Sequence, residues 1–170
     1  VWDKVSERYS AQSVNQPHNQ AFFRVFMETT GVPKGRSYCE VGCGSGMSSA
    51  LLAQMGADVS LVDIAPKALE FARSNFANLG LQATFYQQDA LQMELEDGTF
   101  DVVWNCGVLE HFYDPGKLQL IREMRRITRP GGLVFIAVPN HLHLPFMLGK
   151  KLAELRGIWP YGFEDDLTPR

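Results

Sequence analysis

The order of apolar and polar positions along the chain predicts strands that alternate with helices. Short apolar and β-branched runs indicate strands at 37–41, 58–63, 83–90, 100–107 and 133–140. Helical spacing of apolar residues predicts helices at 47–54, 66–79 and within 117–132, each followed by glycine or proline. Further helical patterns lie within 1–30 and at 146–157. The chain therefore reads as repeated strand-helix units.

Strands that alternate with helices imply parallel pairing through right-handed crossovers. We therefore expect a Rossmann-like, doubly wound α/β fold, with a mainly parallel sheet and helices on both of its faces. In such sheets ligands bind at the carboxyl ends of the strands, near the point where the strand order reverses. We divide the chain into an N-terminal helical lid region (1–36), a ligand-binding core (37–140) and an acceptor-side cap (141–170).

A glycine loop follows the first strand, in the stretch EVGCGSGMSS. The dinucleotide-binding pattern G-x-G-x-x-G has its last glycine at the sixth position. Counted from Gly42, the sixth position of this loop is Met47. Glu40 stands at the mouth of the strand, where a fixed negative charge opposes a pyrophosphate and attracts a cationic ligand such as a sulfonium. A turn that serves only tight packing is the alternative for the glycines alone.

Acidic residues end the second and third predicted strands. Asp63 is placed where nucleoside-binding α/β folds use a carboxylate to accept hydrogen bonds from ribose hydroxyls. Asp89 and the backbone N–H of Ala90 form an acceptor and donor pair that suits adenine, and Ile64 offers an apolar face for its ring. A helix cap at Asp63 and a turn at Asp89 are the plain alternatives.

Composition restricts the class of protein. The 170 residues are 45% hydrophobic and 21% charged, which suits one globular domain with a core of its own. The formal net charge of -3 leaves no broad basic face, so nucleic acid is not expected as a partner. The three cysteines lack metal-site spacing and indicate reduced thiols. With no signal peptide and no spanning apolar stretch in view, we expect a cytoplasmic protein without stable membrane insertion.

Taken together, EVGCGSG, LVDIAPKAL, QQDA, FDVVWNCGVLEHF and RITRPGGLVFIAVPN resemble the class I S-adenosylmethionine-dependent methyltransferases. The resemblance covers about residues 37–140 and is strongest to the small-molecule group called type 11 or quinone-biosynthesis-like. It implies S-adenosylmethionine as cofactor, S-adenosylhomocysteine as product, a small-molecule methyl acceptor, and direct displacement at the methyl carbon.

The resemblance also assigns site residues. It implies that the loop formed by Gly42, Cys43, Gly44 and Gly46 lies against the methionine part of the cofactor. By the same resemblance, Glu40 helps to hold the cofactor amino group, and Asn105 or Cys106 lines the pocket through its backbone. In similar enzymes the N-terminal region folds over the cofactor, so that Tyr9 reaches its carboxylate and Trp2 belongs to the lid; helix packing is the alternative for both.

His111, in LEHF, is the candidate general base if the acceptor carries a proton that must be removed. A structural hydrogen bond in the loop is the alternative. His18, His141 and His143 have no matching array of ligands, so no metal is expected, although His141 and His143 are candidates for the acceptor side.

The methyltransferase sheet of the family has seven strands, whereas no sixth or seventh strand is visible after Asn140. We therefore expect the chain to end before the domain is complete, unless another subunit or a nonstandard edge covers the fifth strand. Trp159, Tyr161 and Phe163 belong either to the acceptor-side cap or to a loop that lacks its partner strands. Two other functions stay open: a non-catalytic, regulatory S-adenosylmethionine-binding domain, and an NAD(P)-dependent oxidoreductase.

Overall fold

The predicted strands form one parallel sheet with the order β3-β2-β1-β4-β5 in the computed structural model of the protein. The strands are β1 (Ser37–Val41), β2 (Asp58–Asp63), β3 (Thr84–Gln87), β4 (Phe100–Cys106) and β5 (Thr128–Ala137). The structure describes residues 2–6, 17–140, 142–165 and 167. Because β2 and β3 lie on one side of β1 while β4 and β5 lie on the other, the strand order reverses at β1, which is where such sheets bind ligands.

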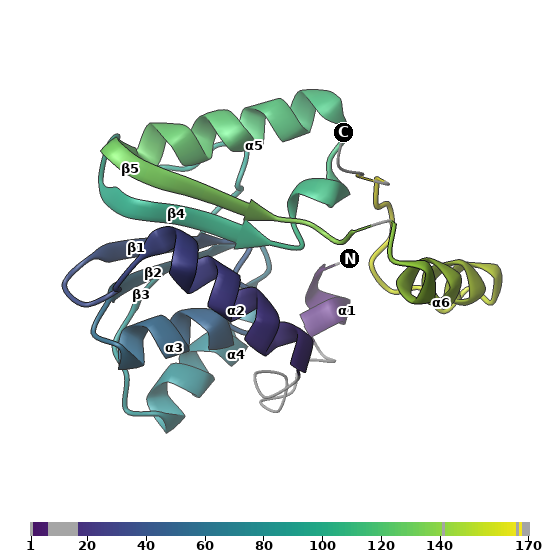
Figure 1. The fold of residues 1–170 in the computed structure, drawn as a ribbon, viewed down its shortest axis with the longest axis horizontal. Helices are drawn as coiled ribbons and strands as arrows, with labels where there is room; N and C mark the ends of the chain where they lie inside the picture. The colour runs from purple at the N-terminus through teal and green to yellow at the C-terminus, as the bar shows by residue number, and fades with distance from the viewer. Residues whose placement is uncertain (1, 7–16, 141, 166, 168–170) are drawn as a thin grey trace.

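Helices cover both faces of the sheet, as expected for a doubly wound fold (Figure 1). One face is covered by α2 (Pro17–Thr30), α3 (Met47–Gln54) and α4 (Pro66–Asn78), and the other by α5 (Asp114–Ile127). Phe26, Leu52 and Phe76 pack with Trp104 of β4 in the first layer. In the second layer the apolar stripe of α5 packs on β1, β2 and β4. The two layers fix the position of the strand ends between them.

The register aligns the first two strands at their carboxyl ends. Val41 pairs with Val62, and Glu40 lies opposite Leu61 on one side and Trp104 on the other. Asp63 is therefore the residue of β2 that comes just after the last pair with β1. The glycine loop that leaves β1 and the acid that ends β2 must consequently lie next to each other.

Several predicted boundaries differ from the structure, chiefly those around β5 and β3. The helix before β5 ends at Ile127 and not at Pro130, and β5 begins at Thr128, earlier than position 133. Proline disfavours the helical conformation at the residue before it, so Arg129 cannot continue the helix. The third strand ends at Gln87, which leaves Asp89 and Ala90 in the turn that follows.

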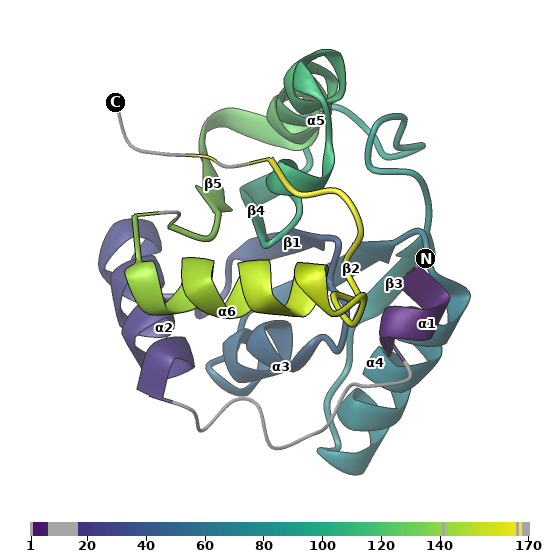
Figure 2. The same ribbon diagram turned by 90° about the vertical axis from the view of Figure 1, so that its right-hand side faces the viewer.

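Several segments gather beyond the carboxyl ends of the strands (Figures 1 and 2). They are α1 (Trp2–Ser6), the short 3₁₀ helix η2 (Leu109–His111), α6 (Leu144–Leu155) and the chain that follows α6. Helix α1 packs against α4, while the chain after α6 returns to η2. The predicted helices within 1–30 and near 146–157 are confirmed, the latter shifted two residues toward the N-terminus.

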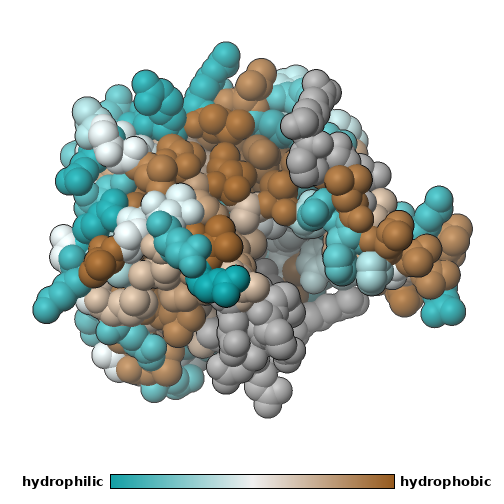
Figure 3. Space-filling view, viewed as in Figure 1, coloured by the Kyte–Doolittle hydropathy of each residue, from teal (hydrophilic) through white to brown (hydrophobic). Residues whose placement is uncertain are grey.

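Apolar side chains are exposed on α6 and half-buried along the sheet edge formed by β5 (Figure 3). On α6 these are Leu144, Leu148, Leu152 and Leu155. Within the described part of the chain, β5 pairs with β4 alone. No helix in that part has both the length and the apolar character required to cross a bilayer.

Candidate cofactor and acceptor site

The loop between β1 and α3 needs its glycines for two physical reasons. Gly42, Gly44 and Gly46 have φ angles of 73°, 51° and 67°, a backbone conformation that side chains disfavour. A Cβ atom on Gly42 would lie 2.5 Å from Cγ2 of Val108, and one on Gly46 would lie 2.7 Å from Cδ2 of Leu61. The loop therefore turns tightly at the sheet edge and exposes its backbone there.

The loop is also bonded to the neighbouring strand. The backbone N–H groups of Gly42 and Cys43 both donate to the carbonyl oxygen of Val62, at 2.8 and 3.0 Å. Gly46 caps α3 without a side-chain hydrogen bond, so the first turn of this helix faces the loop. Tight packing, the alternative reading of these glycines, is thus part of their role and does not compete with ligand binding.

Glu40 lies beneath this loop rather than at an open strand mouth. Its side chain accepts a 2.6 Å hydrogen bond from Oγ of Ser49 on α3, and the residue is only 6% exposed. Burial raises the pKa of the Glu40 carboxyl to about 8; the Ser49 hydrogen bond lowers it, and the neighbouring Asp63 raises it further. In the ligand-free protein this raised pKa favours the protonated carboxyl near neutral pH, and an approaching cation favours the charged form.

Asp63 connects the loop to the start of the next helix. Its Oδ2 accepts a hydrogen bond from Gly44 N and its Oδ1 one from Ala65 N, both at 2.9 Å. Burial raises the pKa of Asp63, although these two backbone hydrogen bonds oppose the rise. Each carboxylate oxygen keeps capacity for a further donor. Asp63 is not the cap of α4, whose N-cap is Ala65 without a side-chain hydrogen bond. Its bonds fix the turn before the helix and are compatible with a ribose-binding role.

The residues predicted to hold adenine lie on the neighbouring side of the site. Ile64 directly follows Asp63 and is 52% exposed, so an apolar surface is available beside the carboxylate. Asp89 is exposed, and its Oδ1 accepts from Leu91 N at 2.9 Å. This bond is the predicted turn; it leaves Oδ2 of Asp89 and the backbone of Ala90 in the same region for a ligand.

The two residues that end β4 differ in exposure. Asn105 is fully buried, and its amide Nδ2 donates to Sδ of Met124 on α5 at 3.2 Å, so the side chain points into the core. Cys106 is exposed at the end of the strand. Desolvation of its thiol raises the pKa to about 12, with smaller contributions from Glu40 and Glu110, which favours the protonated thiol. The cysteines form no disulfide, as expected.

His111 is held from three directions in η2. Its Nδ1 lies 2.9 Å from the carbonyl oxygen of Phe163, and the edge of Trp2 from α1 contacts the ring with centroids 4.6 Å apart. A carbonyl oxygen only accepts, so Nδ1 carries the proton in this contact and the neutral ring has its lone pair on Nε2. That nitrogen lies 4.0 Å from Oε1 of Glu164. The structural alternative for His111 is real, and it leaves Nε2 able to accept a proton.

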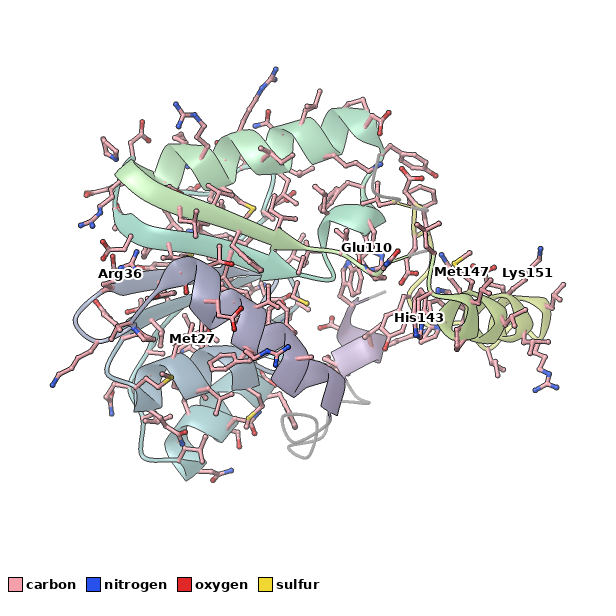
Figure 4. The ribbon with its side chains drawn as sticks, viewed as in Figure 1. Met27, Arg36, Glu110, His143, Met147 and Lys151 are labelled. Atoms are coloured by element: carbon pink, nitrogen blue, oxygen red, sulfur yellow. The ribbon has the colours of Figure 1, made fainter. Side chains whose placement is uncertain are left out.

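A group of buried charged residues next to His111 was missed by the sequence reasoning. Glu110 is 1% exposed, and Lys150 forms an ion pair with Glu164 at 3.2 Å with both side chains buried. Burial raises the pKa of Glu110 to about 7, the charge of Glu164 raises it further, and Lys150 lowers it. Figure 4 shows Glu110 at the carboxyl edge, in the region where η2 faces α6. Only the apolar setting of Glu110 in LEHF hinted at this burial.

The remaining candidates are placed as follows. Tyr9 and His141 lie outside the described residues, as does the side chain of His18. His143 precedes α6, where its Nδ1 accepts from Phe146 N at 3.4 Å, so it caps this helix. Across the described ranges, 2–6, 17–140, 142–165 and 167, no three His, Cys, Asp or Glu residues are arranged to hold a metal ion.

The residues at this edge suit S-adenosylmethionine. The cofactor carries an ammonium group, a positive sulfur and a ribose, which match the buried Glu40 and Asp63 carboxyls and the glycine loop above them. The Gly42 position has no room for a side chain because Val108 packs against it, so glycine is needed for the loop to pass this point. The exposed Ile64 supplies the apolar surface.

Comparison with known proteins agrees with this chemistry. Residues 39–132 match the family model described as "Methyltransferase domain". The chain is 31% identical over 140 residues to a ubiquinone biosynthesis O-methyltransferase of Bordetella avium, an alignment that covers 82% of this chain and 56% of that protein. The same enzyme from Pseudomonas paraeruginosa is 34% identical over 141 residues, with coverages of 82% and 57%. The chain therefore spans little more than half the length of these relatives.

A solved structure supports the fold independently. A SAM-dependent methyltransferase from Aquifex aeolicus superimposes with a TM-score of 0.67 at 17% identity, over 82% of this chain and 73% of that one. At this identity the likeness concerns the fold alone. The family model, by contrast, covers more than half of the sequence and includes the glycine loop, the acid that ends β2 and η2. The chain belongs to the class I S-adenosylmethionine-dependent methyltransferase family.

Proposed function

We propose that the protein transfers a methyl group from S-adenosylmethionine to a hydroxyl oxygen of a small-molecule acceptor. The observation that carries this proposal is the position of two buried carboxyls, Glu40 and Asp63, beneath and beside one glycine loop at the strand-order reversal. Two acids at this point suit a cationic nucleoside, whose positive charge favours their ionised form, and they offer a pyrophosphate no positive group to bind, which argues against an NAD(P)-dependent oxidoreductase.

A hydroxyl acceptor is favoured by two features. The curated relatives in Bordetella avium and Pseudomonas paraeruginosa are named O-methyltransferases. His111 keeps its Nε2 lone pair available, because Nδ1 donates to the Phe163 carbonyl. A hydroxyl proton must leave during methylation, and a nearby imidazole nitrogen is the kind of group that accepts it near neutral pH.

When bound, the cofactor supplies a methyl group on a positively charged sulfur, which is already an activated leaving group. The chain's own contribution is to bind, to orient and to exclude water. In this proposal Glu40 balances the positive charge, Asp63 accepts from the ribose, and Asp89, Ala90 and Ile64 receive the adenine. In the same proposal α1 belongs to the lid side of the site, and α6 with residues 159–165 belongs to the acceptor side.

The net charge of -3 and the absence of a broad basic face favour a metabolite over nucleic acid, and we place the activity in the cytoplasm. Calorimetric titration with S-adenosylmethionine, S-adenosylhomocysteine and NAD tests the cofactor. Transfer of a labelled methyl group to a panel of hydroxyl, amine and thiol acceptors tests the reaction. Binding of NAD alone would reject the proposal, and cofactor binding without turnover on any acceptor would favour a regulatory domain.

A further inference from the structure

The segment that follows α6, residues 159–165, returns to the sheet edge and is fixed there by several independent contacts. The backbone N–H of Asp165 donates to the Glu110 carbonyl at 2.8 Å, and the Phe163 ring stacks on Tyr113 with centroids 4.2 Å apart. The side chain of Asp165 forms an ion pair with Lys117 of α5. Figure 2 shows this segment running from α6 back toward η2 and α5. We call residues 159–165 the return segment.

The return segment brings two groups to the same histidine. The Phe163 carbonyl accepts from Nδ1 of His111 at 2.9 Å, and Oε1 of Glu164 lies 4.0 Å from Nε2 on the other side of the ring. The other carboxylate oxygen of Glu164 lies 3.2 Å from Nζ of Lys150. With 5% of its side chain exposed, Glu164 is held in one place by the lysine and directed toward the histidine.

We propose that Glu164 is a positioning residue for His111: the Phe163 carbonyl selects the ring tautomer with a free Nε2, and Glu164 stabilises the imidazolium that forms when Nε2 takes a proton. The return segment is then part of the acceptor site and completes it, although it lies outside the residues that match the family model. This inference rests on the proposed function for its chemical meaning, while its geometric content is tested without turnover.

The proposed step balances as follows. A lone pair of the acceptor oxygen forms a bond to the methyl carbon, the carbon–sulfur bond breaks, and its electron pair stays on sulfur. The hydroxyl proton passes to Nε2 of His111, which becomes a cation. A carboxylate 4.0 Å away in a largely buried setting favours that cation, because opposite charges at a given distance attract more strongly in a buried setting than in water.

The charged groups around His111 come from every element packed against it. They are Asp3 and Lys4 on α1, Glu110 on η2, Asp114 and Lys117 on α5, Lys150 on α6, and Glu164 and Asp165 on the return segment. Asp114 and Asp165 pair with Lys117, and Trp2 is the α1 residue that contacts the ring. Glu164 is the carboxylate within 4.0 Å of the ring.

Nitrogen-detected NMR of the full chain, labelled at histidine, tests the proposal directly. We expect the neutral ring of His111 to be protonated on Nδ1 in the unmodified protein. Glu164→Gln should leave this tautomer in place, since the Phe163 carbonyl still accepts from Nδ1, while it removes the negative charge beside Nε2. Glu154→Gln is the matched control, because it removes an exposed carboxylate from α6 and should change neither the tautomer nor turnover.

Catalysis gives a second measurement. In Glu164→Gln kcat should fall while KM for the cofactor stays unchanged, because the imidazolium loses the carboxylate that faces it. Glu164→Asp should recover part of kcat. An Nε2-protonated ring in the unmodified protein overturns the proposal even if no variant folds. An unchanged kcat in Glu164→Gln does so too, whereas an Nδ1-protonated ring in a protein without methyl transfer upholds the geometry at the histidine and rejects only the proposed reaction.

Discussion

Ser49 donates a 2.6 Å hydrogen bond to the carboxyl of Glu40, and this bond joins the first turns of α3 to β1 directly under the glycine loop. In the described part of the chain, the buried Glu40 carboxyl has Ser49 as its hydrogen-bond partner and forms no ion pair with a cationic side chain. The carboxyl is consequently held ready to become charged when a positive group arrives. This relationship links the stability of the fold to the charge of its ligand.

We expect Glu40→Gln to stabilise the ligand-free protein at alkaline pH. Burial raises the pKa of Glu40 to about 8, so the native state binds a proton more tightly than the unfolded chain, and stability falls as pH rises from about 4.5 through about 8. Between pH 6 and pH 9 the parent should lose on the order of 2 kcal/mol more unfolding free energy than the variant. Urea unfolding at both values measures this.

The matched control for charge is Asp58→Asn, which removes an exposed carboxylate at the start of β2. It should leave the pH dependence of unfolding as in the parent. Glu110, whose pKa burial raises to about 7, contributes equally to the parent and to the Glu40 variant and cancels in their difference. Parallel pH curves for the parent and Glu40→Gln would show that Glu40 is already charged at neutral pH.

Gly46→Ala should destabilise the fold by about 2–4 kcal/mol, from left-handed backbone strain plus overpacking. Its Cβ would lie 2.7 Å from Cδ2 of Leu61 on β2 and 3.0 Å from Cβ of Ala72 on α4. Moving these two packed elements apart would disrupt the core between them. Gly80→Ala is the control, because Gly80 has nearly the same φ, 66°, and nothing within 4 Å of the added atom. Chemical denaturation of both variants separates packing from strain, and equal losses would assign the whole effect to φ.

Local patterns in the sequence predicted the strands and the glycine loop, because each depends on neighbours along the chain. The ends of β1 and β2 agree with the structure to the residue. Asp63 was found for the same reason, since a strand end and a following helix start define its place. The end of α5 before Thr128 was also predictable in principle, because Pro130 disfavours a helical backbone at Arg129.

Contacts between distant segments could not be predicted. Nothing local in Glu40 indicates that Ser49 will meet it, or that burial will leave it protonated. Lys150 and Glu164 come together only because α6 and the return segment are folded against η2, and a single sequence carries no sign of that packing. The chemistry of His111 depends on these contacts, so the sequence could suggest a role for this residue but could not supply the contacts that support it.

Asp63→Ala should weaken cofactor binding by about 1–3 kcal/mol, since ribose hydroxyls would lose a charged acceptor. The same change removes the acceptor of Gly44 N and Ala65 N, so the loop would loosen as well. Asp63→Asn separates the two effects: its amide oxygen can still accept from Gly44 N, while the charge is gone. Calorimetry on both variants, with unfolding curves alongside, measures this, and unchanged affinity in both would remove Asp63 from the site.

His111→Gln should lower kcat by about 10²–10⁴-fold if Nε2 accepts the hydroxyl proton. Glutamine keeps a donor for the Phe163 carbonyl, so the return segment can stay attached while the base is lost. Cofactor affinity should therefore remain near that of the parent, which separates a chemical role from a structural one. Phe163 acts through its backbone, so the companion variant is Tyr113→Ala, which removes the ring stacked on Phe163 and loosens the segment while keeping the imidazole. A larger loss of kcat in Tyr113→Ala than in His111→Gln would mean that closure of the acceptor side, and not proton transfer to His111, limits the reaction.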